Sequence, residues 1–212
     1  MVSPLYLSSN IFILFCSSLL FCFLCIPNAL ADDTPKTRLK ALQKAGIFPK
    51  LTGEVFRADK ALGVEYQGGL QVTMGNFLTP AQTAKSPHIR FQGDPDSTYT
   101  LMLIDPDAPT IADPKWGPWR HWIVVNIPGE RQSSNSAQST QLTSYVGPAP
   151  PPKTGDHRYI FLLYKQPSFN KNYPPLSETF DDRRNFNFTD YAIKTGLKLH
   201  AVNFFYSKNA QS

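Results

Sequence analysis

Three apolar, strand-like runs in this sequence each carry an aspartate or a histidine at one end. The runs and their polar end residues are Tyr99–Ile104 followed by Asp105 and Asp107, Trp122–Ile127 preceded by His121, and Tyr159–Tyr164 preceded by His157. Runs of this length and composition are typical of buried β-strands. Polar groups at the ends of neighbouring buried strands would form a small polar pocket in an all-β scaffold.

Several chemistries fit these side chains. A carboxylate, two imidazoles and the phenol of Tyr159 could bind a metal ion, act as an acid and a base, or hold an anion. Spacing alone does not separate these three possibilities, because the groups come from three distant segments. A buried carboxylate such as Asp105 needs hydrogen-bond partners or a cation, since its desolvation is otherwise costly.

Two kinds of site are disfavoured by what the sequence lacks. No Gly-x-Ser-x-Gly nucleophile elbow occurs in the chain, which weakens a Ser-His-Asp hydrolase interpretation. Cys16, Cys22 and Cys25 all lie in an apolar N-terminal segment. Zinc sites built on thiolate, and disulfides, are therefore not expected in the rest of the chain.

The N-terminal segment, residues 1–31, has the pattern of a secretory signal peptide. Ile11–Ile26 is almost wholly apolar but short for a membrane span, and Ala29-Leu30-Ala31 is a small-x-small cleavage pattern. We expect cleavage after Ala31 and export to the exterior, the secretory pathway or a vacuole. An uncleaved anchor is the alternative, because residues 1–10 contain no Lys or Arg.

The formal net charge is +5, and it lies entirely in residues 32–212. The densest basic spots are Lys36–Lys44 and Arg183-Arg184, and neither has the aromatic interleaving of a nucleic-acid surface. We therefore expect a solvated basic surface and no nucleic-acid partner. Asn187-Phe188-Thr189 is the only N-glycosylation sequon, and secretion would make it usable.

The remaining elements are read from capping residues, apolar spacing and turn residues. Asp33-Thr34-Pro35 predicts the start of a helix that Gly46 and Pro49 end. Further expected elements are strands at Leu70–Met74 and His200–Tyr206, an exposed loop at Gln132–Thr143, an irregular connection at Pro167–Asn185 and a short helix at Thr189–Thr195. We therefore predict one mostly β domain over residues 32–212, a β-sandwich with a few peripheral helices.

Two groups of residues resemble the signature regions of the phosphatidylethanolamine-binding protein family. The first is Asp105-Pro-Asp-Ala-Pro109 with Trp119-x-His121, and the second is Gly155-x-His-Arg-Tyr159. The likeness begins at Leu42-x-Lys-Ala-Gly-Ile-x-Pro49 and reaches Phe204-Phe-Tyr206. It thus covers nearly all of residues 32–212.

The resemblance implies a β-sandwich of a large and a smaller sheet, with an anion pocket at one edge. The residues expected to bind ligand there are Asp105, His121, His157, Tyr159, Trp119, Pro109, Ala149 and Pro150, and those expected to support the pocket are Asp107, Arg158 and Pro118. An aspartate beside an imidazole would raise the pKa of the imidazole and favour anion binding below neutral pH.

The resemblance also implies a function. We expect a secreted, non-catalytic binding protein without a cofactor, whose ligand is a phosphate-bearing small molecule or a phospholipid head group. It would act by sequestering or inhibiting a partner. The alternative is an inhibitor of a serine carboxypeptidase, as fungal members of the family are, acting through a protein surface. A hydrolase is less favoured, because no activated nucleophile is evident.

Two details of the family pattern can be checked in a structure. The family often has glycine where this chain has Ala149, a change that matters only if that residue needs a positive φ. The family also tends to have a cis peptide just before the pocket tryptophan. Here that bond is Gly117–Pro118, and we predict that it is cis.

Overall fold

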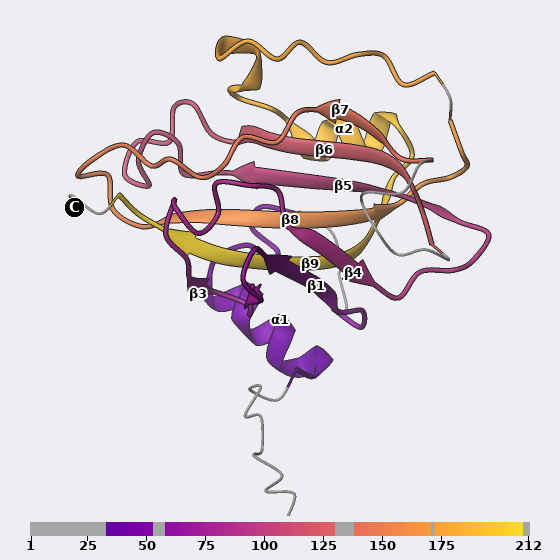
Figure 1. Ribbon diagram of the computed structural model, residues 1–212, viewed down its shortest axis with the longest axis horizontal. Coiled ribbons are helices and arrows are strands. Elements are labelled where there is room, and N and C mark those ends of the chain that lie inside the picture. Colours follow the sequence, from indigo (N-terminus) through magenta and orange to yellow (C-terminus); the bar gives the residue numbers. More distant parts are fainter. Residues whose placement is uncertain (1–32, 53–57, 130–137, 171, 210–212) are drawn as a thin grey trace, which may run out of the picture. The chain divides into compact units, whose positions relative to one another are not determined.

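The computed structural model describes residues 33–52, 58–129, 138–170 and 172–209 of the 212-residue chain. The predicted signal peptide, residues 1–31, lies outside the described residues. Within the described part of the chain, no helix is long and apolar enough to cross a membrane. These residues form two β-sheets and two short α-helices, as the sequence predicts (Figure 1).

Six strands form the larger sheet, in the order β3-β9-β8-β5-β6-β7. Their bounds are β3 Asn76–Phe77, β5 Thr98–Asp105, β6 Trp119–Pro128, β7 Thr140–Thr143, β8 His157–Lys165 and β9 Lys198–Ser207. Neighbouring strands are antiparallel, except β3 and β9, which are parallel. Almost every residue of β5, β6 and β8 is buried. These central strands are apolar along most of their length because both faces of the sheet are covered.

Three strands form the smaller sheet, in the order β2-β1-β4. Their bounds are β1 Leu62–Tyr66, β2 Leu70–Gln71 and β4 His88–Phe91. Burial alternates along β1 and β4, so one face of this sheet packs and the other is more exposed. The core between the two sheets includes Val64, Tyr66, Ile89, Tyr99, Leu103, Phe161 and Phe205. The structure therefore confirms a β-sandwich of a large and a smaller sheet.

The opposite face of the larger sheet is covered by the helices α1 (Pro35–Lys44) and α2 (Phe188–Lys194). Its core includes Leu42, Ile47, Met102, Ile104, Ile160, Leu162 and Phe188. The hydroxyl of Thr34 caps α1 by accepting the backbone N–H of Thr37 at 3.3 Å, as the sequence predicts. Alternate residues of β5 thus face the helices and the smaller sheet, which is the period of an extended strand.

One asparagine joins the two sheets. Nδ2 of Asn203, on β9, donates to the carbonyl oxygens of Leu62 at 2.8 Å and Val72 at 2.9 Å. Its Oδ1 accepts the backbone N–H of Met74 at 3.0 Å. The side chain therefore satisfies three backbone groups of the segment that carries β1 and β2, at a position that is only 6% exposed.

The structure corrects two predicted elements. Of the predicted strand Leu70–Met74, only Leu70–Gln71 forms β2, and Val72 adds one backbone hydrogen bond to Val64. Met74 has a φ of 50° and Gly75 a φ of 105°, which turn the chain away. Thr140–Thr143, predicted as exposed loop, forms β7 on the edge of β6 and buries its last two residues. The rest of the predicted loop, up to residue 137, lies outside the described residues.

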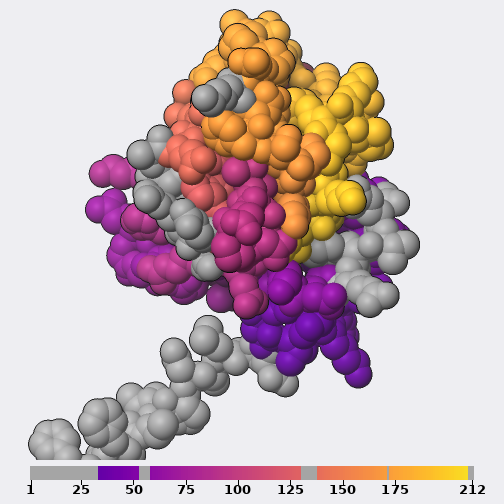
Figure 2. All heavy atoms as spheres, turned by 90° about the vertical axis from the view of Figure 1, so that its right-hand side faces the viewer, coloured from indigo at the N-terminus to yellow at the C-terminus, as the bar shows by residue number. Residues whose placement is uncertain are grey.

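The long connection between β8 and α2 is irregular, as predicted, apart from the short 3₁₀ helix η1 (Asp181–Arg183). It passes along the β7 side of the larger sheet in Figure 1 and lies at the surface in Figure 2, where it is coloured orange. Its contacts with Ser144 are among those that hold it there. The carboxylate of Glu178 accepts the backbone N–H of Ser144 at 2.9 Å, and Arg183 donates to the carbonyl oxygen of Ser144 at 3.1 Å.

Replacing Asn203 by alanine should lower the free energy of unfolding by about 3 kcal/mol, because two carbonyl oxygens and one N–H lose their buried partner. Urea unfolding followed by intrinsic fluorescence measures this change. Asn172→Ala, at an exposed asparagine, is the matched control and should change stability by less than about 0.5 kcal/mol. Equal stability of the two variants would show that Asn203 does not hold the sheets together.

Candidate functional site

The candidate site lies where one end of β5 meets the ends of β6 and β8. β5 ends at Asp105, and its neighbours β6 and β8 begin at Trp119 and His157. The register pairs Asp105 with Trp119 on one side and Ile104 with Ile160 on the other. Antiparallel pairing therefore brings the end of one strand beside the beginnings of two others, at the left of the sheet in Figure 1.

A β-bulge turns His121 toward this site. Successive residues of β5 pair with Trp122 and then with Arg120, so His121 is an extra residue in β6. Without the bulge, strand alternation would place His121 on the face opposite to Trp122. The imidazole instead meets Tyr159 edge to face, with the ring centroids 5.2 Å apart.

Asp105 and His157 form a buried hydrogen-bonded pair. Nδ1 of His157 lies 2.8 Å from Oδ2 of Asp105, and the two side chains are 1% and 5% exposed, respectively. The other carboxylate oxygen accepts the backbone N–H of Asp107 at 2.8 Å. Nε2 of His157 lies 3.0 Å from the hydroxyl oxygen of Thr154. Each oxygen and each ring nitrogen of the pair thus has a partner, as burial requires.

Tyr159 lies beside this pair, and its ring is stacked on that of His157 with an interplanar angle of 16°. Burial raises the pKa of the Tyr159 phenol far above its usual value of 10.0, and the charge of Asp105 and a hydrogen bond to it raise the pKa further. The phenol is therefore neutral at physiological pH, and its O–H is available to the carboxylate.

The imidazole of His121 meets a backbone carbonyl, whereas that of His157 meets a carboxylate. Its Nδ1 lies 2.7 Å from the carbonyl oxygen of Val146. Burial lowers the pKa of His121 from 6.5 to about 4, and the opposing attraction of Asp105 is the smaller effect. Asp105 thus does raise the pKa of the His121 imidazole, but lost solvation outweighs this attraction and the net shift is downward.

The predicted wall residues lie in the segments that border the cluster. The ring of Trp119 meets that of His121 with centroids 4.3 Å apart. Ala149 has no positive φ, so the difference from glycine causes no backbone strain. The carbonyl oxygen of Pro150 accepts Nδ2 of Asn209 at 3.2 Å.

Two of the prolines near the site follow cis peptide bonds. The Gly117–Pro118 bond is cis, which confirms the prediction, and the Ala108–Pro109 bond is also cis. Pro109 and Pro118 both lie in the connection between β5 and β6. Gly117 packs so closely that an added Cβ would lie 2.3 Å from the carbonyl oxygen of Pro106. This connection therefore has no room for a larger residue at that position.

Asp107 and Arg158 form a bidentate ion pair next to this cluster. Nε and Nη2 of Arg158 donate to the two oxygens of Asp107 at 2.9 Å and 2.5 Å. Nη1 of Arg158 donates to the carbonyl oxygen of Ala45 at 2.8 Å. This bidentate pair joins the chain after β5 to the start of β8 and to the end of α1.

Arg183 is a further site residue, one that the sequence indicated only as part of a solvated basic spot. It is buried, and its Nη1 donates to the carbonyl oxygens of Arg120 at 3.1 Å and His121 at 3.3 Å. The guanidinium also lies 5.4 Å from the ring centroid of Trp119. Arg183 therefore holds the start of β6 in place. Its role depends on backbone carbonyls of distant residues, which no sequence motif reveals.

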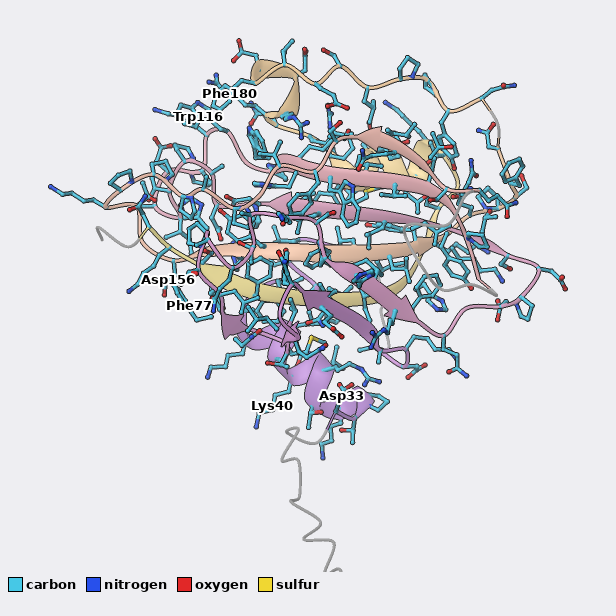
Figure 3. The ribbon with its side chains drawn as sticks, viewed as in Figure 1. Asp33, Lys40, Phe77, Trp116, Asp156 and Phe180 are labelled. Carbon is cyan, nitrogen blue, oxygen red and sulfur yellow. The ribbon has the colours of Figure 1, made fainter. Side chains whose placement is uncertain are left out.

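Next to Trp119, the side chains of Trp116 and Phe180 form a second aromatic group, which we call the aromatic rim. Trp116 and Phe180 point toward each other at the edge of the molecule (Figure 3), with ring centroids 6.0 Å apart. The guanidinium of Arg184 lies 4.5 Å from one ring and 4.4 Å from the other. Phe180 remains 56% exposed. The rim thus combines a cation with accessible aromatic surface.

The glycosylation sequon lies away from these contacts. Asn187 is exposed and caps α2, where its Oδ1 accepts the backbone N–H of Asp190 at 3.0 Å. The same oxygen accepts the Thr189 hydroxyl at 2.8 Å. The amide nitrogen, to which a glycan would be joined, has no part in these bonds. Glycosylation of Asn187 stays a prediction.

The cluster suits hydrogen bonding rather than metal coordination. In the described ranges, no group of three or more His, Cys, Asp or Glu is placed to hold a metal ion. The partners of Asp105 and His157 are N–H, O–H and each other, whereas a metal site would need converging lone pairs.

Comparison with known proteins identifies the family. The model of the phosphatidylethanolamine-binding protein family matches residues 58–211, which include both signature regions and all of the site described above. The protein therefore belongs to the phosphatidylethanolamine-binding protein family, as the resemblance of its motifs indicates.

Individual relatives agree with this result. A 26 kDa secreted antigen of Toxocara canis is 36% identical over 168 residues, which make up 77% of this chain and 62% of that protein. The match thus spans less than two thirds of the antigen. The crystal structure of a carboxypeptidase Y inhibitor complexed with its cognate proteinase aligns with a TM-score of 0.74 and 28% identity, over 84% of this chain and 98% of the inhibitor. A phosphatidylethanolamine-binding protein of Plasmodium vivax shares the fold, with a TM-score of 0.70 and 24% identity, over 81% and 97% of the two chains.

The lowered pKa of His121 predicts acid sensitivity. Since the unfolded chain takes up a proton near pH 6.5 and the folded chain only near pH 4, this residue should remove about 3 kcal/mol of stability as the pH falls from 7 to 4. Urea unfolding at four pH values should therefore give a shallower loss in His121→Phe than in the wild type. His88→Phe, at an exposed histidine on β4, should keep the wild-type slope. Parallel slopes for the wild type and His121→Phe would contradict the prediction.

Proposed function

We propose that this protein is a secreted, non-catalytic binding protein that takes a phosphate-bearing ligand at the cluster of Asp105, His121, His157 and Tyr159. The observation that carries the proposal is the convergence of these four buried polar side chains at the ends of three otherwise apolar strands. Burying such groups is costly unless they are hydrogen-bonded, and a core needs none of them. Their convergence is therefore best explained by a ligand.

The chemistry around the cluster favours binding over catalysis. The hydroxyl of Thr154 donates to the carbonyl oxygen of Pro151 at 2.7 Å, so it is held as a structural group. The raised pKa of Tyr159 keeps its phenol from acting as an oxyanion nucleophile. A hydrolase would need an activated nucleophile next to a base, and neither of these hydroxyls meets that need.

Ligand binding can be tested on protein purified from cells that express the whole 212-residue chain. Methyl phosphate, titrated at pH 5.5 by calorimetry, should bind to the wild type. Asp105→Asn and His157→Ala should weaken binding by about tenfold or more, because each breaks the buried hydrogen-bonded pair around which the site is built. His88→Ala, outside the site, should bind like the wild type. Absence of binding by the folded wild type would refute the proposal.

A second candidate function is inhibition of a serine carboxypeptidase. It is favoured by the similarity to a carboxypeptidase Y inhibitor crystallised with its cognate proteinase. In that case a protein surface would carry the function and the ligand site would be incidental. The same His157→Ala protein separates the two candidates. Inhibition that survives in this variant while methyl phosphate binding is lost would place the inhibitory function outside the site.

Secretion is part of the proposal, supported by the apolar segment 11–26 and by the similarity to a secreted antigen. Eukaryotic cells expressing the chain should release a protein that begins at Asp32 and becomes smaller on treatment with an N-glycosidase. Thr189→Ala, which destroys the sequon but keeps the capping Asn187, should be released without the size change. Mass spectrometry and N-terminal sequencing measure both results. A product that stays with the cells and retains residues 1–31 would contradict secretion.

A further inference from the structure

Helix α1 has a row of lysines on its exposed side. Lys36, Lys40 and Lys44 are spaced by four residues, and all three side chains are exposed. Residues at this spacing in an α-helix lie about 6 Å apart along the axis and about 40° apart around it. The three lysines therefore form one row along the helix, which we call the lysine ridge. Figure 3 shows Lys40 pointing away from the two sheets.

The opposite side of α1 packs against the domain and fixes the orientation of the ridge. Arg38 and Leu42 are buried, and Leu39 packs against the core on the helix side of the larger sheet. Nε of Arg38 also donates to the carbonyl oxygen of Ala58 at 2.9 Å. The helix is thus held by its apolar side and by one buried arginine, so the lysine ridge faces outward.

Neighbouring carboxylates do not compensate the charge of the ridge. None of the ten residues of α1 is acidic. Asp33, which precedes the helix, is already paired with Arg38 at 2.8 Å. Among the residues that the structure describes, no carboxylate forms an ion pair with a lysine of the ridge. The described chain therefore leaves these three ammonium groups to the solvent or to a partner.

The stability of the helix does not explain this arrangement. Like charges four residues apart on a helix repel each other and destabilise it. Lys36 lies in the first turn, where the positive end of the helix dipole disfavours a cation, and only Lys44, in the last turn, is well placed. Glutamine forms helices about as well as lysine without this repulsion. The three lysines are therefore best explained by a negatively charged partner.

The other residues on this side of α1 indicate the kind of partner. Thr37 and Gln43 are exposed within the same third of the helix circumference, and this sector contains no aromatic or large apolar residue. Single-stranded nucleic acids bind to aromatic stacking platforms, and a helix on a membrane surface needs a free apolar face. The apolar face of α1 is used by the core. A hydrophilic chain with sulfate groups along its length matches a row of lysines with hydroxyl and amide groups beside them.

We propose that the lysine ridge of α1 binds a sulfated polysaccharide. The ammonium groups would pair with successive sulfates and release the cations condensed on the chain, as lysines do on other linear polyanions. Sulfated polysaccharides are extracellular, so this proposal shares with the proposed function the location outside the cell. It does not involve the cluster of Asp105 and His157. Binding through α1 would retain the secreted protein where such polysaccharides are concentrated.

Heparin is the probe for this proposal, with protein purified from cells that express the whole 212-residue chain. The wild type should bind heparin at about 0.15 M salt, and its affinity should fall steeply as the salt concentration rises. The triple variant Lys36→Gln, Lys40→Gln and Lys44→Gln should bind at least about tenfold more weakly in calorimetry. Its resistance to urea should equal or exceed that of the wild type, because the substitutions remove repulsion within the helix.

A matched control removes the same charge from other elements. Lys85, Lys194 and Lys198 are exposed before β4, at the end of α2 and at the start of β9, respectively. Replacing these three by glutamine should change the affinity for heparin by less than about threefold, because scattered charges at a distance are screened by salt. An equal loss in the two triple variants would show that only the net charge matters, and would overturn the proposal.

Three other results would also overturn the proposal. The first is a folded wild type that does not bind heparin, and the second is a ridge variant that binds heparin like the wild type. The third is binding that depends on the ridge but is tighter to phosphatidylserine vesicles than to heparin, which would assign α1 to a membrane. Saturating methyl phosphate should leave heparin binding unchanged. Displacement by methyl phosphate would assign heparin to the phosphate site, and would refute the ridge while leaving the proposed function intact.

Discussion

The hydrogen bond between Asp105 and His157 is the interaction on which the candidate site depends. A carboxylate and an imidazole at this depth are stable only as a pair, since removing one would leave the other uncompensated in a desolvated position. The surrounding chain meets this demand on both sides. The backbone of Asp107 supplies the second donor to the carboxylate, and the hydroxyl of Thr154 is the partner of the ring nitrogen on the far side. The two loops that border the site are thus shaped by one buried pair.

The sequence was a good guide to the larger sheet and to the residues that meet at its end. β5, β6 and β8 are apolar along nearly their whole length, so neither their existence nor their burial was ambiguous. The position of Asp105 after one run and of His157 before another predicted their meeting, because antiparallel strands bring such ends together. The family motif added the roles of Asp107 and Arg158, and their bidentate pairing agrees with it.

What the sequence could not predict is the chemistry that depends on backbone carbonyls. The tautomer of His121 is set by the carbonyl of Val146, and Arg183 is buried because it meets the carbonyls of Arg120 and Ser144. Every residue has a carbonyl group, so no residue type signals such a contact. The β-bulge at His121 also leaves no signal in the sequence, because it consists of one extra residue in an otherwise regular strand. These features required coordinates.

The larger sheet ends in short strands on both sides, with two residues in β3 and four in β7. Long unpaired edges are templates on which a second chain can add a strand and begin an aggregate. Residues 32–212 contain no cysteine, so disulfides cannot fasten these edges. Next to β7, the carboxylate of Glu178 occupies the backbone N–H of Ser144, which a new strand would otherwise use. Protection of these edges against strand addition therefore has to come from how the sheet is terminated, since covalent cross-links cannot provide it.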